Sequence, residues 1–272
     1  MPTNVSLSFG VINHVLFLKS LKSTSMKKIF LLLFLLLPIL GCENGNNLTF
    51  EPIELHGKNC AECPKINIDI PRALDELAVS TSINRALEEE IISLLSFDEE
   101  KSINTMQEAM ASFTKSYNDL RLKFPDETVG WEAEILGKVI YEDNTLLTIE
   151  LNSYTFTGGA HGYSSSTLLN FDKVKGSELE NWELFEDYEG FQKFAETQFR
   201  IQEDVPQDEN INATGFMFEK DTFHLAENIG YTKNGVQLIY NQYEVASYAD
   251  GPIVLNLPYS EINQYLKRKV EL

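Results

Sequence analysis

The stretch TLLTIELNSYTFTGGAHGYSSSTLLNFDKV, residues 145–174, decides the fold of this chain. Its first part, Thr145–Phe156, is rich in Ile, Leu, Thr and Tyr, which favour β-strands, and Ser164–Val174 continues in the same way. The glycines between them predict a tight connection. A short polar turn separates this pair from a similar upstream run, Trp131–Tyr141. Three strands on short connections predict an antiparallel meander.

Upstream of the meander, apolar residues recur at helical spacing in two series. Leu74–Leu95 and Met106–Phe124 each place their large apolar side chains on one face, and Pro125 ends the second series. Before them, Lys65–Ile70 alternates apolar and polar residues as a half-buried strand does, and Pro71 ends it. We expect the two helices to cover one face of the sheet.

A second unit is expected to begin near Gly176. Its strongest local signal is Asn234-Gly235, which favours a β-hairpin. The further elements expected are helices at 191–201 and 259–269 and strands at 222–229, 236–241 and 253–257. The predicted class is therefore α+β, with antiparallel sheets and helices packed on one face, in two consecutive subdomains, 64–175 and 176–272.

The segment from Met26 to Cys42 has the layout of a lipoprotein signal peptide. A Lys27-Lys28 start precedes Ile29–Leu40, twelve uncharged and mostly apolar residues. A membrane-spanning helix needs about 20 such residues, whereas a signal-peptide core needs roughly 7 to 15. The run ends in Leu40-Gly41-Cys42, which resembles the lipobox of bacterial lipoproteins. A buried helix with a core cysteine is the alternative, but nothing in the run alternates with polar residues.

We therefore expect residues 1–41 to comprise an upstream extension, 1–25, and a signal peptide. Cys42 is the expected lipidation site, where more than one acyl chain would hold the protein on a membrane. Residues 42–63 are expected to form a lipidated tether, because Glu43–Asn59 is polar and lacks periodicity. The predicted location is the cell envelope, facing the periplasm or the exterior.

The charge balance limits the partners. The chain has 22 Lys and Arg against 41 Asp and Glu, a net charge of −19. Such a surface disfavours nucleic acid and anionic lipid head groups, because both are polyanions. It favours a basic partner, although a solvated surface accounts for most of these carboxylates. The 43% hydrophobic and 11% aromatic content is that of a globular protein with a core.

The remaining cysteines, Cys60 and Cys63, stand in a Cys-x-x-Cys pair. In an oxidising envelope we expect them to form a disulfide. His56 nearby leaves a metal site open, but zinc needs four ligands and no second cysteine pair exists to supply them. Pro64 and a strand-like run follow the pair, which is the wrong order for a thioredoxin-like redox motif. We predict neither a metal site nor a cofactor.

Three stretches together resemble a known domain pair. They are residues 65–95 with Ile83-Asn84, YTFTGGAHG at 154–162, and residues 240–259 centred on YEVASYADGP. In this order they resemble the paired extracellular domains of the peptidoglycan deacetylase PdaC and of RsiV, an anti-sigma factor that senses lysozyme. The resemblance spans roughly residues 64–270 and implies an α+β fold. It implies no active site, since the deacetylase's chemistry belongs to a further, metal-dependent domain, but it does imply binding of lysozyme, a strongly basic enzyme.

Two places are candidates for ligand binding. His161 lies among glycines that leave it open to a ligand, or the glycines serve a tight turn in which the imidazole bonds to backbone. Tyr243, Glu244, Tyr248 and Asp250 form an aromatic and acidic cluster. It is either a binding rim, with rigid rings and carboxylates that attract cations, or a loop that caps the core.

Three function classes follow, one of which is a structural envelope protein with no soluble ligand. The leading one is an envelope lipoprotein that binds a protein or cell-wall ligand without catalysis, with lysozyme, another basic protein or peptidoglycan as partner. The competing class is a peptidoglycan- or glycan-acting enzyme with paired carboxylates in an acidic cleft. Ser164–Ser166 lacks the glycine-flanked elbow of serine hydrolases, and His224 is expected to be structural in a strand. We predict no catalytic residue.

Overall fold

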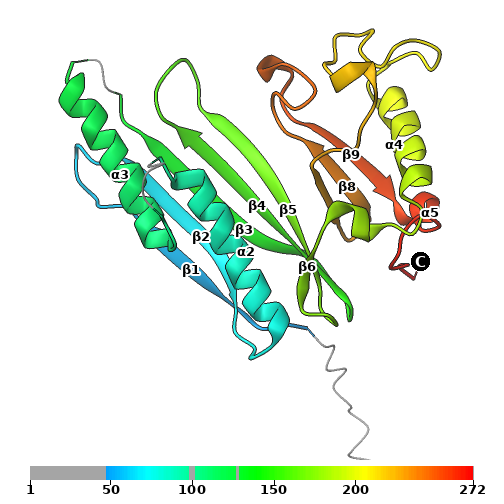
Figure 1. Cartoon of the computed structure of the whole chain (residues 1–272), viewed down its shortest axis with the longest axis horizontal. Helices are drawn as coiled ribbons and strands as arrows, with labels where there is room; N and C mark the ends of the chain where they lie inside the picture. Colours follow the sequence, from blue (N-terminus) through cyan, green and yellow to red (C-terminus); the bar gives the residue numbers. More distant parts are fainter. Residues whose placement is uncertain (1–46, 98–101, 127–128, 272) are drawn as a thin grey trace, which may run out of the picture. The chain divides into compact units, whose positions relative to one another are not determined.

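The structure is a computed structural model that describes residues 47–97, 102–126 and 129–271. The predicted signal peptide and the lipidation site Cys42 lie outside the described residues. The chain forms a six-stranded sheet and, further along the sequence, a three-stranded sheet. Figure 1 shows how the helices and strands are arranged. In the described part of the chain, no helix is both long and apolar enough to cross a membrane.

The first sheet has the strand order β1-β2-β3-β4-β5-β6, and helices α2 and α3 cover one of its faces. Its elements are β1 (Phe50–His56), β2 (Lys65–Ala73), α2 (Ala78–Leu95), α3 (Met106–Lys123), β3 (Glu132–Glu142), β4 (Leu146–Phe156), β5 (Tyr163–Asp172) and β6 (Ser177–Leu179). The predicted antiparallel meander is confirmed as β3-β4-β5.

One pair of strands in this sheet, β2 and β3, is parallel. The two helices between them carry the chain back along the sheet, so that β3 starts at the same end as β2, as a parallel pair requires. The predicted α+β class holds, with this one parallel pair inside an otherwise antiparallel sheet.

The expectation of an aperiodic tether through residue 59 is wrong for Phe50–His56, which form β1. This strand pairs with β2 along its whole length. Ile53 and Leu55 alternate with exposed glutamates and pack on the core under the helices. Pro52 is tolerated because β1 is an edge strand, where a missing N–H costs no ladder hydrogen bond.

At the junction between β2 and α2, the side-chain amide of Asn84 pairs with both backbone groups of Ala73, as a neighbouring peptide group would. The Asn84 amide donates to the Ala73 carbonyl at 3.0 Å, and its oxygen accepts from the Ala73 N–H at 2.9 Å. Asn84 thus ties the start of α2 to the end of β2, which gives a structural reason for the Ile83-Asn84 pair noted in the sequence.

The second sheet has the order β7-β8-β9 and packs against α4 and α5. The elements are α4 (Tyr188–Gln202), β7 (Asn228–Tyr231), β8 (Gly235–Tyr240), β9 (Ile253–Pro258) and α5 (Tyr259–Ile262). The hairpin predicted at Asn234-Gly235 is confirmed. The strand expected at 222–229 starts only at Asn228, so His224 is not in a strand.

Two boundaries differ from those expected. The terminal helix ends at Ile262 instead of 269, because the Asn263 amide bonds both ways with the Val270 backbone at 2.8 and 2.9 Å and turns the chain back. β6, which follows Gly176, pairs with β5 and so belongs to the first sheet. The second hydrophobic cluster nevertheless takes in Leu179 at the end of β6.

Beyond β6, amide side chains of the second unit cover the edge of β5. Asn241 accepts from the Ser166 N–H at 2.9 Å and donates to the Ser166 carbonyl at 3.0 Å. Asn228 accepts from the Leu168 N–H. In the other direction, the buried Asn170 of β5 donates to the Ile229 carbonyl of β7 at 2.7 Å. Hydrogen bonds of side chains therefore take the place of a backbone ladder between the two sheets.

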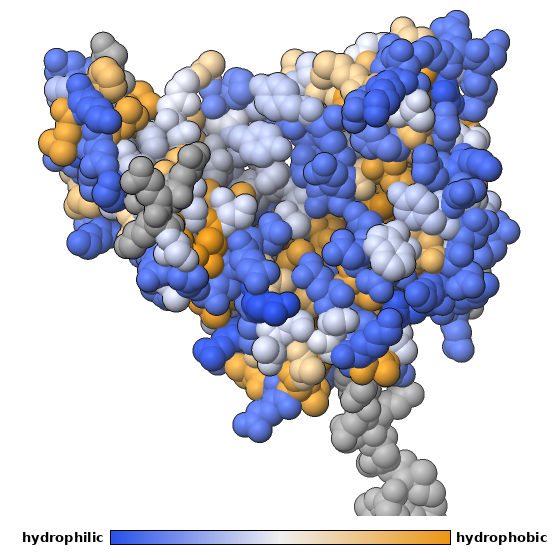
Figure 2. Space-filling model, in the orientation of Figure 1, coloured by the Kyte–Doolittle hydropathy of each residue, from blue (hydrophilic) through white to orange (hydrophobic). Residues whose placement is uncertain are grey.

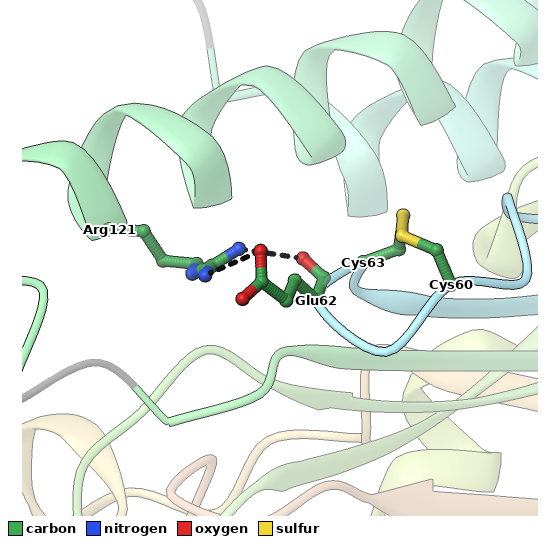
Figure 3. The surroundings of a disulfide bond; sticks show 4 residues. All are labelled: Cys60, Glu62, Cys63 and Arg121. Carbon is green, nitrogen blue, oxygen red and sulfur yellow. Dashed lines mark hydrogen bonds and ion pairs between the residues drawn. A yellow bond between two sulfur atoms is a disulfide. The ribbon is translucent and has the colours of Figure 1, made fainter.

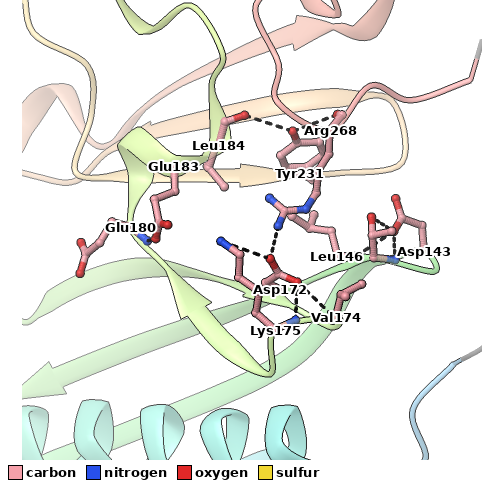
Figure 4. A network of polar contacts seen from close by, with 11 residues as sticks. Asp143, Leu146, Asp172, Val174, Lys175, Glu180, Glu183, Leu184, Tyr231 and Arg268 are labelled. Atoms are coloured by element: carbon pink, nitrogen blue, oxygen red, sulfur yellow. Dashed lines mark hydrogen bonds and ion pairs between the residues drawn. The ribbon is translucent and has the colours of Figure 1, made fainter.

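A charged pair closes the other end of this junction (Figure 4). The Arg268 guanidinium bonds to the Asp172 carboxylate, whose side chain is only 4% exposed. The same carboxylate accepts from the N–H groups of Val174 and Lys175 at 2.9 and 2.8 Å. The Tyr231 hydroxyl donates to the Arg268 carbonyl at 3.2 Å. One carboxylate thus holds both a turn of the first sheet and the C-terminal segment.

Replacing Asp172 by Asn should lower the free energy of unfolding by about 3 kcal/mol, because the Arg268 guanidinium, on a side chain only 18% exposed, loses its counter-charge. Urea denaturation measures this. The matched control is Glu89→Gln, which breaks the exposed Arg85–Glu89 pair and should cost no more than about 0.5 kcal/mol. Equal losses in the two variants would show that the Asp172–Arg268 pair does not hold the junction.

Candidate functional site

The structure brings together four of the five residues proposed for ligand binding. His161 lies in the β4–β5 connection, and the other three lie between β8 and β9. The His161 ring stacks on the Tyr248 ring, with centroids 3.6 Å apart and planes 19° apart. The Tyr243 ring follows at 5.7 Å from Tyr248, and Glu244 is next in the chain. Two distant loops thus meet in a row of three rings.

The glycines around His161 have the structural role that was one of the two expectations. Gly158 and Gly159 have φ values of 106° and 88°, which only glycine adopts without strain. A Cβ at Gly162 would lie 2.4 Å from the ring of Tyr154. The turn leaves the imidazole exposed against Tyr248, so the motif also positions His161 at the surface.

Beside the rings lies an open groove of about 690 Å³. We call it the acidic-aromatic groove, and its lining residues are Tyr163, Met217, Glu219, His224, Glu227, Asn241, Gln242, Tyr243 and Glu244. Three of its side chains are large and exposed, Tyr163 (39%), Met217 (52%) and Tyr243 (56%). Three carboxylates share the groove with them, which makes it a place of negative charge next to apolar contact area.

Among the three groove carboxylates, Glu244 has both oxygens hydrogen-bonded to the backbone. Its two oxygens accept from the N–H groups of Glu227 and Asn241 at 2.9 and 2.8 Å. Burial raises the pKa of Glu244 above its usual range, and the charge of Glu227 adds to this, against the two N–H donors. Burial and both glutamates also raise the pKa of Tyr163. The groove is therefore a region of negative potential in which a cation is favoured.

Asp250, the fifth candidate, has a structural task. Its carboxylate accepts from the backbone N–H and the hydroxyl of Ser247 at 3.1 and 2.6 Å. These bonds cap the short turn Tyr248–Asp250. Asp250 therefore shapes the loop that presents Tyr248, and it does not line the groove.

Sequence reasoning missed six groove residues, which are Tyr163, Met217, Glu219, Glu227, Asn241 and Gln242. They come from the start of β5, from residues 217–227 and from the segment after β8, and no local spacing connects these three segments. His224, expected to be structural, does bond to the Leu225 carbonyl at 3.0 Å, but it also lines the groove.

Two serines of the Ser164–Ser166 run make hydrogen bonds across the strands. Ser165 pairs with Ser153, and Ser166 donates to Asn152, each at 2.7 Å. These contacts between β4 and β5 give the serines a structural role in the sheet.

Cys60 and Cys63 are joined by a disulfide, with their Cα atoms 5.2 Å apart. Arg121 of α3 reaches down to the loop between them (Figure 3). It donates to the Glu62 carbonyl at 3.0 Å and pairs with the Glu62 carboxylate at 3.2 Å. Within the described ranges, no three His, Cys, Asp or Glu side chains gather closely enough to hold a metal ion.

The fold and this site define a class, an α+β protein of two consecutive domains with a polar groove built from loops of both. Comparison with family models makes the class specific. Residues 58–164 match the family described as "Deacetylase PdaC", and residues 179–260 match the family described as "Protein of unknown function (DUF3298)". The two matches follow one another along the chain, which therefore carries both domain types in tandem. Such domains are typical of extracellular proteins of the cell envelope.

Two solved structures share the fold. A DUF3298 family protein from Bacteroides fragilis is 22% identical, with a TM-score of 0.63 over 83% of this chain and 95% of that one. A DUF3298 family protein from Pseudomonas aeruginosa is 24% identical, with a TM-score of 0.59 over 81% of this chain and 95% of that one. At this identity the likeness shows the fold alone. No curated protein matches the chain.

Tyr243 has a φ of 70°, in the left-handed region that side chains avoid. Because its ring is exposed, Tyr243→Gly should relieve strain with little loss of packing and raise the free energy of unfolding by about 0.5–1 kcal/mol. Tyr163→Gly, at the other exposed tyrosine of the groove, removes a side chain from a strand and should lower it. Urea denaturation measures the free energy of unfolding of both variants. If both variants lose stability, the Tyr243 backbone is not strained.

Proposed function

We propose that the protein is a lipid-anchored component of the cell envelope that binds a basic protein, lysozyme foremost, without catalysis. The observation that carries this proposal is the acidic-aromatic groove, where exposed rings stand beside three carboxylates. The envelope location rests on the PdaC and DUF3298 domains, and the anchor rests on the sequence around Cys42. Lysozyme as partner rests on the likeness to the sensor domain of RsiV.

The groove offers what a cationic protein surface needs. Tyrosine rings provide rigid contact area, and an arginine or lysine of the partner gains from the face of a ring as well as from a carboxylate. The net charge of −19 would speed the encounter with a basic partner. On the face shown in Figure 2, hydrophilic side chains predominate, as expected of a surface that meets water and charged partners.

Catalysis on glycans is the competing function. It requires a pair of carboxyl groups that are free to act on the substrate. Glu244, the groove carboxyl whose pKa burial raises, instead has both oxygens on backbone N–H groups. This arrangement favours a binding groove over an acid–base pair.

The anchor is tested at Cys42. Cys42→Ala should abolish incorporation of a radioactive fatty acid in cells and leave unprocessed precursor, because no sulfur remains to take the lipid. Cys63→Ala, at a cysteine outside the signal region, serves as the control and should leave labelling intact. Equal labelling of the Cys42 variant and the unchanged protein would rule out this site.

The partner is tested by comparing lysozyme with cytochrome c, a basic protein of similar size, on the purified protein. A specific interface should prefer lysozyme by at least about tenfold, or about 1.4 kcal/mol, and part of the preference should survive moderate salt, which screens only the charges. Calorimetry measures both affinities. Equal binding of the two proteins, lost together in salt, would leave only a charged surface without specificity.

The same measurement locates the interface. Tyr243→Gly removes an exposed ring and should reduce the preference for lysozyme about tenfold if the groove forms the contact. Leu122→Ala removes an exposed apolar side chain from α3, outside the groove, and should leave binding unchanged. A loss of preference in both variants, or in neither, would contradict binding at the groove.

A further inference from the structure

Exposed apolar side chains gather at one end of the first sheet. Leu74 (44%), Leu77 (53%) and Val174 (77%) are exposed, the leucines at the start of α2 and the valine in the connection from β5 to β6. The two segments touch, because the Ser82 hydroxyl of α2 donates to the Gly176 carbonyl at 2.7 Å. Both lie at the end of the sheet where β2 and β5 finish (Figure 1). We call Leu74, Leu77 and Val174 the apolar tip.

The first described residues of the chain are fixed beside the apolar tip. The Leu74 N–H donates to the Thr49 carbonyl at 2.9 Å. The Leu48 N–H donates to the Glu142 carboxylate at 2.7 Å, and the same oxygen accepts from the Lys173 ammonium at 2.7 Å. One residue therefore contacts α2's leading segment and the next contacts a carboxylate shared with the β5–β6 connection. The chain enters the fold next to the tip.

The distance from the expected lipid site to this entry point is short. Cys42 stands five residues before Asn47, the first described residue, and five residues span at most about 17 Å when fully extended. Because Phe50–His56 form β1, much of the expected tether belongs to the fold. Lipid on Cys42 would therefore hold the end that carries the apolar tip close to the bilayer.

Leu77 is an unusual residue for its position. It is the N-cap of α2 and makes no side-chain cap hydrogen bond, whereas Thr105 and Asp187 cap α3 and α4. Ser, Thr, Asp and Asn are preferred at an N-cap because their oxygens accept from N–H groups of the first turn, which a leucine cannot do. Natural proteins break such local rules chiefly at functional sites. An exposed leucine here indicates an apolar contact outside the chain.

We propose that the apolar tip is a membrane-contact surface, which enters the head-group region of the bilayer that holds the lipid of Cys42. This inference rests on the lipid anchor of the proposed function. Apolar side chains gain free energy when they leave water at the boundary between head groups and acyl chains. The anchor makes the contact intramolecular, so a tip of three side chains is enough to fix the orientation.

The orientation decides where the acidic-aromatic groove lies. β5 runs from Tyr163, which lines the groove, to Asp172, two residues before Val174. Its 10 residues rise about 3.3 Å each, so the strand is about 30 Å long. With the tip on the membrane, β5 holds the groove up to about 30 Å away from the bilayer, open to a protein in solution.

Fluorescence quenching tests the contact on the lipidated full chain, reconstituted into vesicles of zwitterionic phosphatidylcholine with or without bromine on the acyl chains. Val174→Cys and Tyr163→Cys, at opposite ends of β5, are each labelled with a bimane dye. Cys60 and Cys63 are joined in a disulfide, and Cys42 carries the lipid, so the dye reacts with the introduced thiol. Bromine should reduce the fluorescence of the dye at position 174 at least about twofold and leave the dye at position 163 unchanged.

A charge on the tip provides the second arm of the test. Aspartate is a favoured N-cap, so Leu77→Asp preserves α2 while it opposes entry of the tip into the bilayer. In the labelled Val174→Cys protein, it should remove at least about half of the quenching. The matched control is Leu122→Asp, at an exposed leucine near the end of α3, which should leave the quenching unchanged.

Flotation of the vesicles on a density gradient reports the anchor separately. The membrane contact is overturned, and the anchor stands, if the protein floats with the vesicles but the two dye positions are quenched equally. Equal effects of the two aspartate variants on a floating protein overturn it in the same way. A protein that does not float lacks the anchor, and the proposed anchoring and the membrane contact then both fail.

Discussion

The edge of β5 is the constraint on which the rest of the structure depends. A strand edge inside a protein must find partners for its N–H and carbonyl groups. β6 covers only one end of β5, and further along the edge the amide side chains of Asn228 and Asn241 bond to the backbone of Leu168 and Ser166. Amides can do this because each carries a donor and an acceptor, as a peptide group does. The two sheets are thereby fixed to one another without a continuous ladder.

The acidic-aromatic groove follows from this junction. Asn241, which bonds to β5, also gives its N–H to Glu244, so the same residue joins the sheets and places a groove carboxylate. Tyr163 opens β5, and Tyr243 comes two residues after Asn241. Both rings line the groove because β5 and the segment after β8 are joined there. The backbone of Tyr243 is in the left-handed region, a strained conformation that persists because the surrounding structure fixes it.

Two hollows of the described structure are stiffened in different ways. The acidic-aromatic groove combines exposed rings with three carboxylates, and Glu244 among these accepts hydrogen bonds from two backbone N–H groups. A cavity between α3 and the disulfide loop is bounded by that disulfide and by Arg121, which donates to the Glu62 carbonyl.

The sequence alone determined the elements whose signals are local. Strand-favouring residues on short connections predicted the meander, helical spacing predicted α2 and α3, and Asn234-Gly235 predicted the hairpin. The sequence also singled out His161 and Tyr243 for the candidate site. Only the tertiary structure decided what depends on distant partners. β1 forms because β2 offers it an edge, and Glu227 joins the groove because its chain passes Glu244. Burial and hydrogen bonds between remote segments produce no local pattern in the sequence, because these contacts form only when the chain has folded.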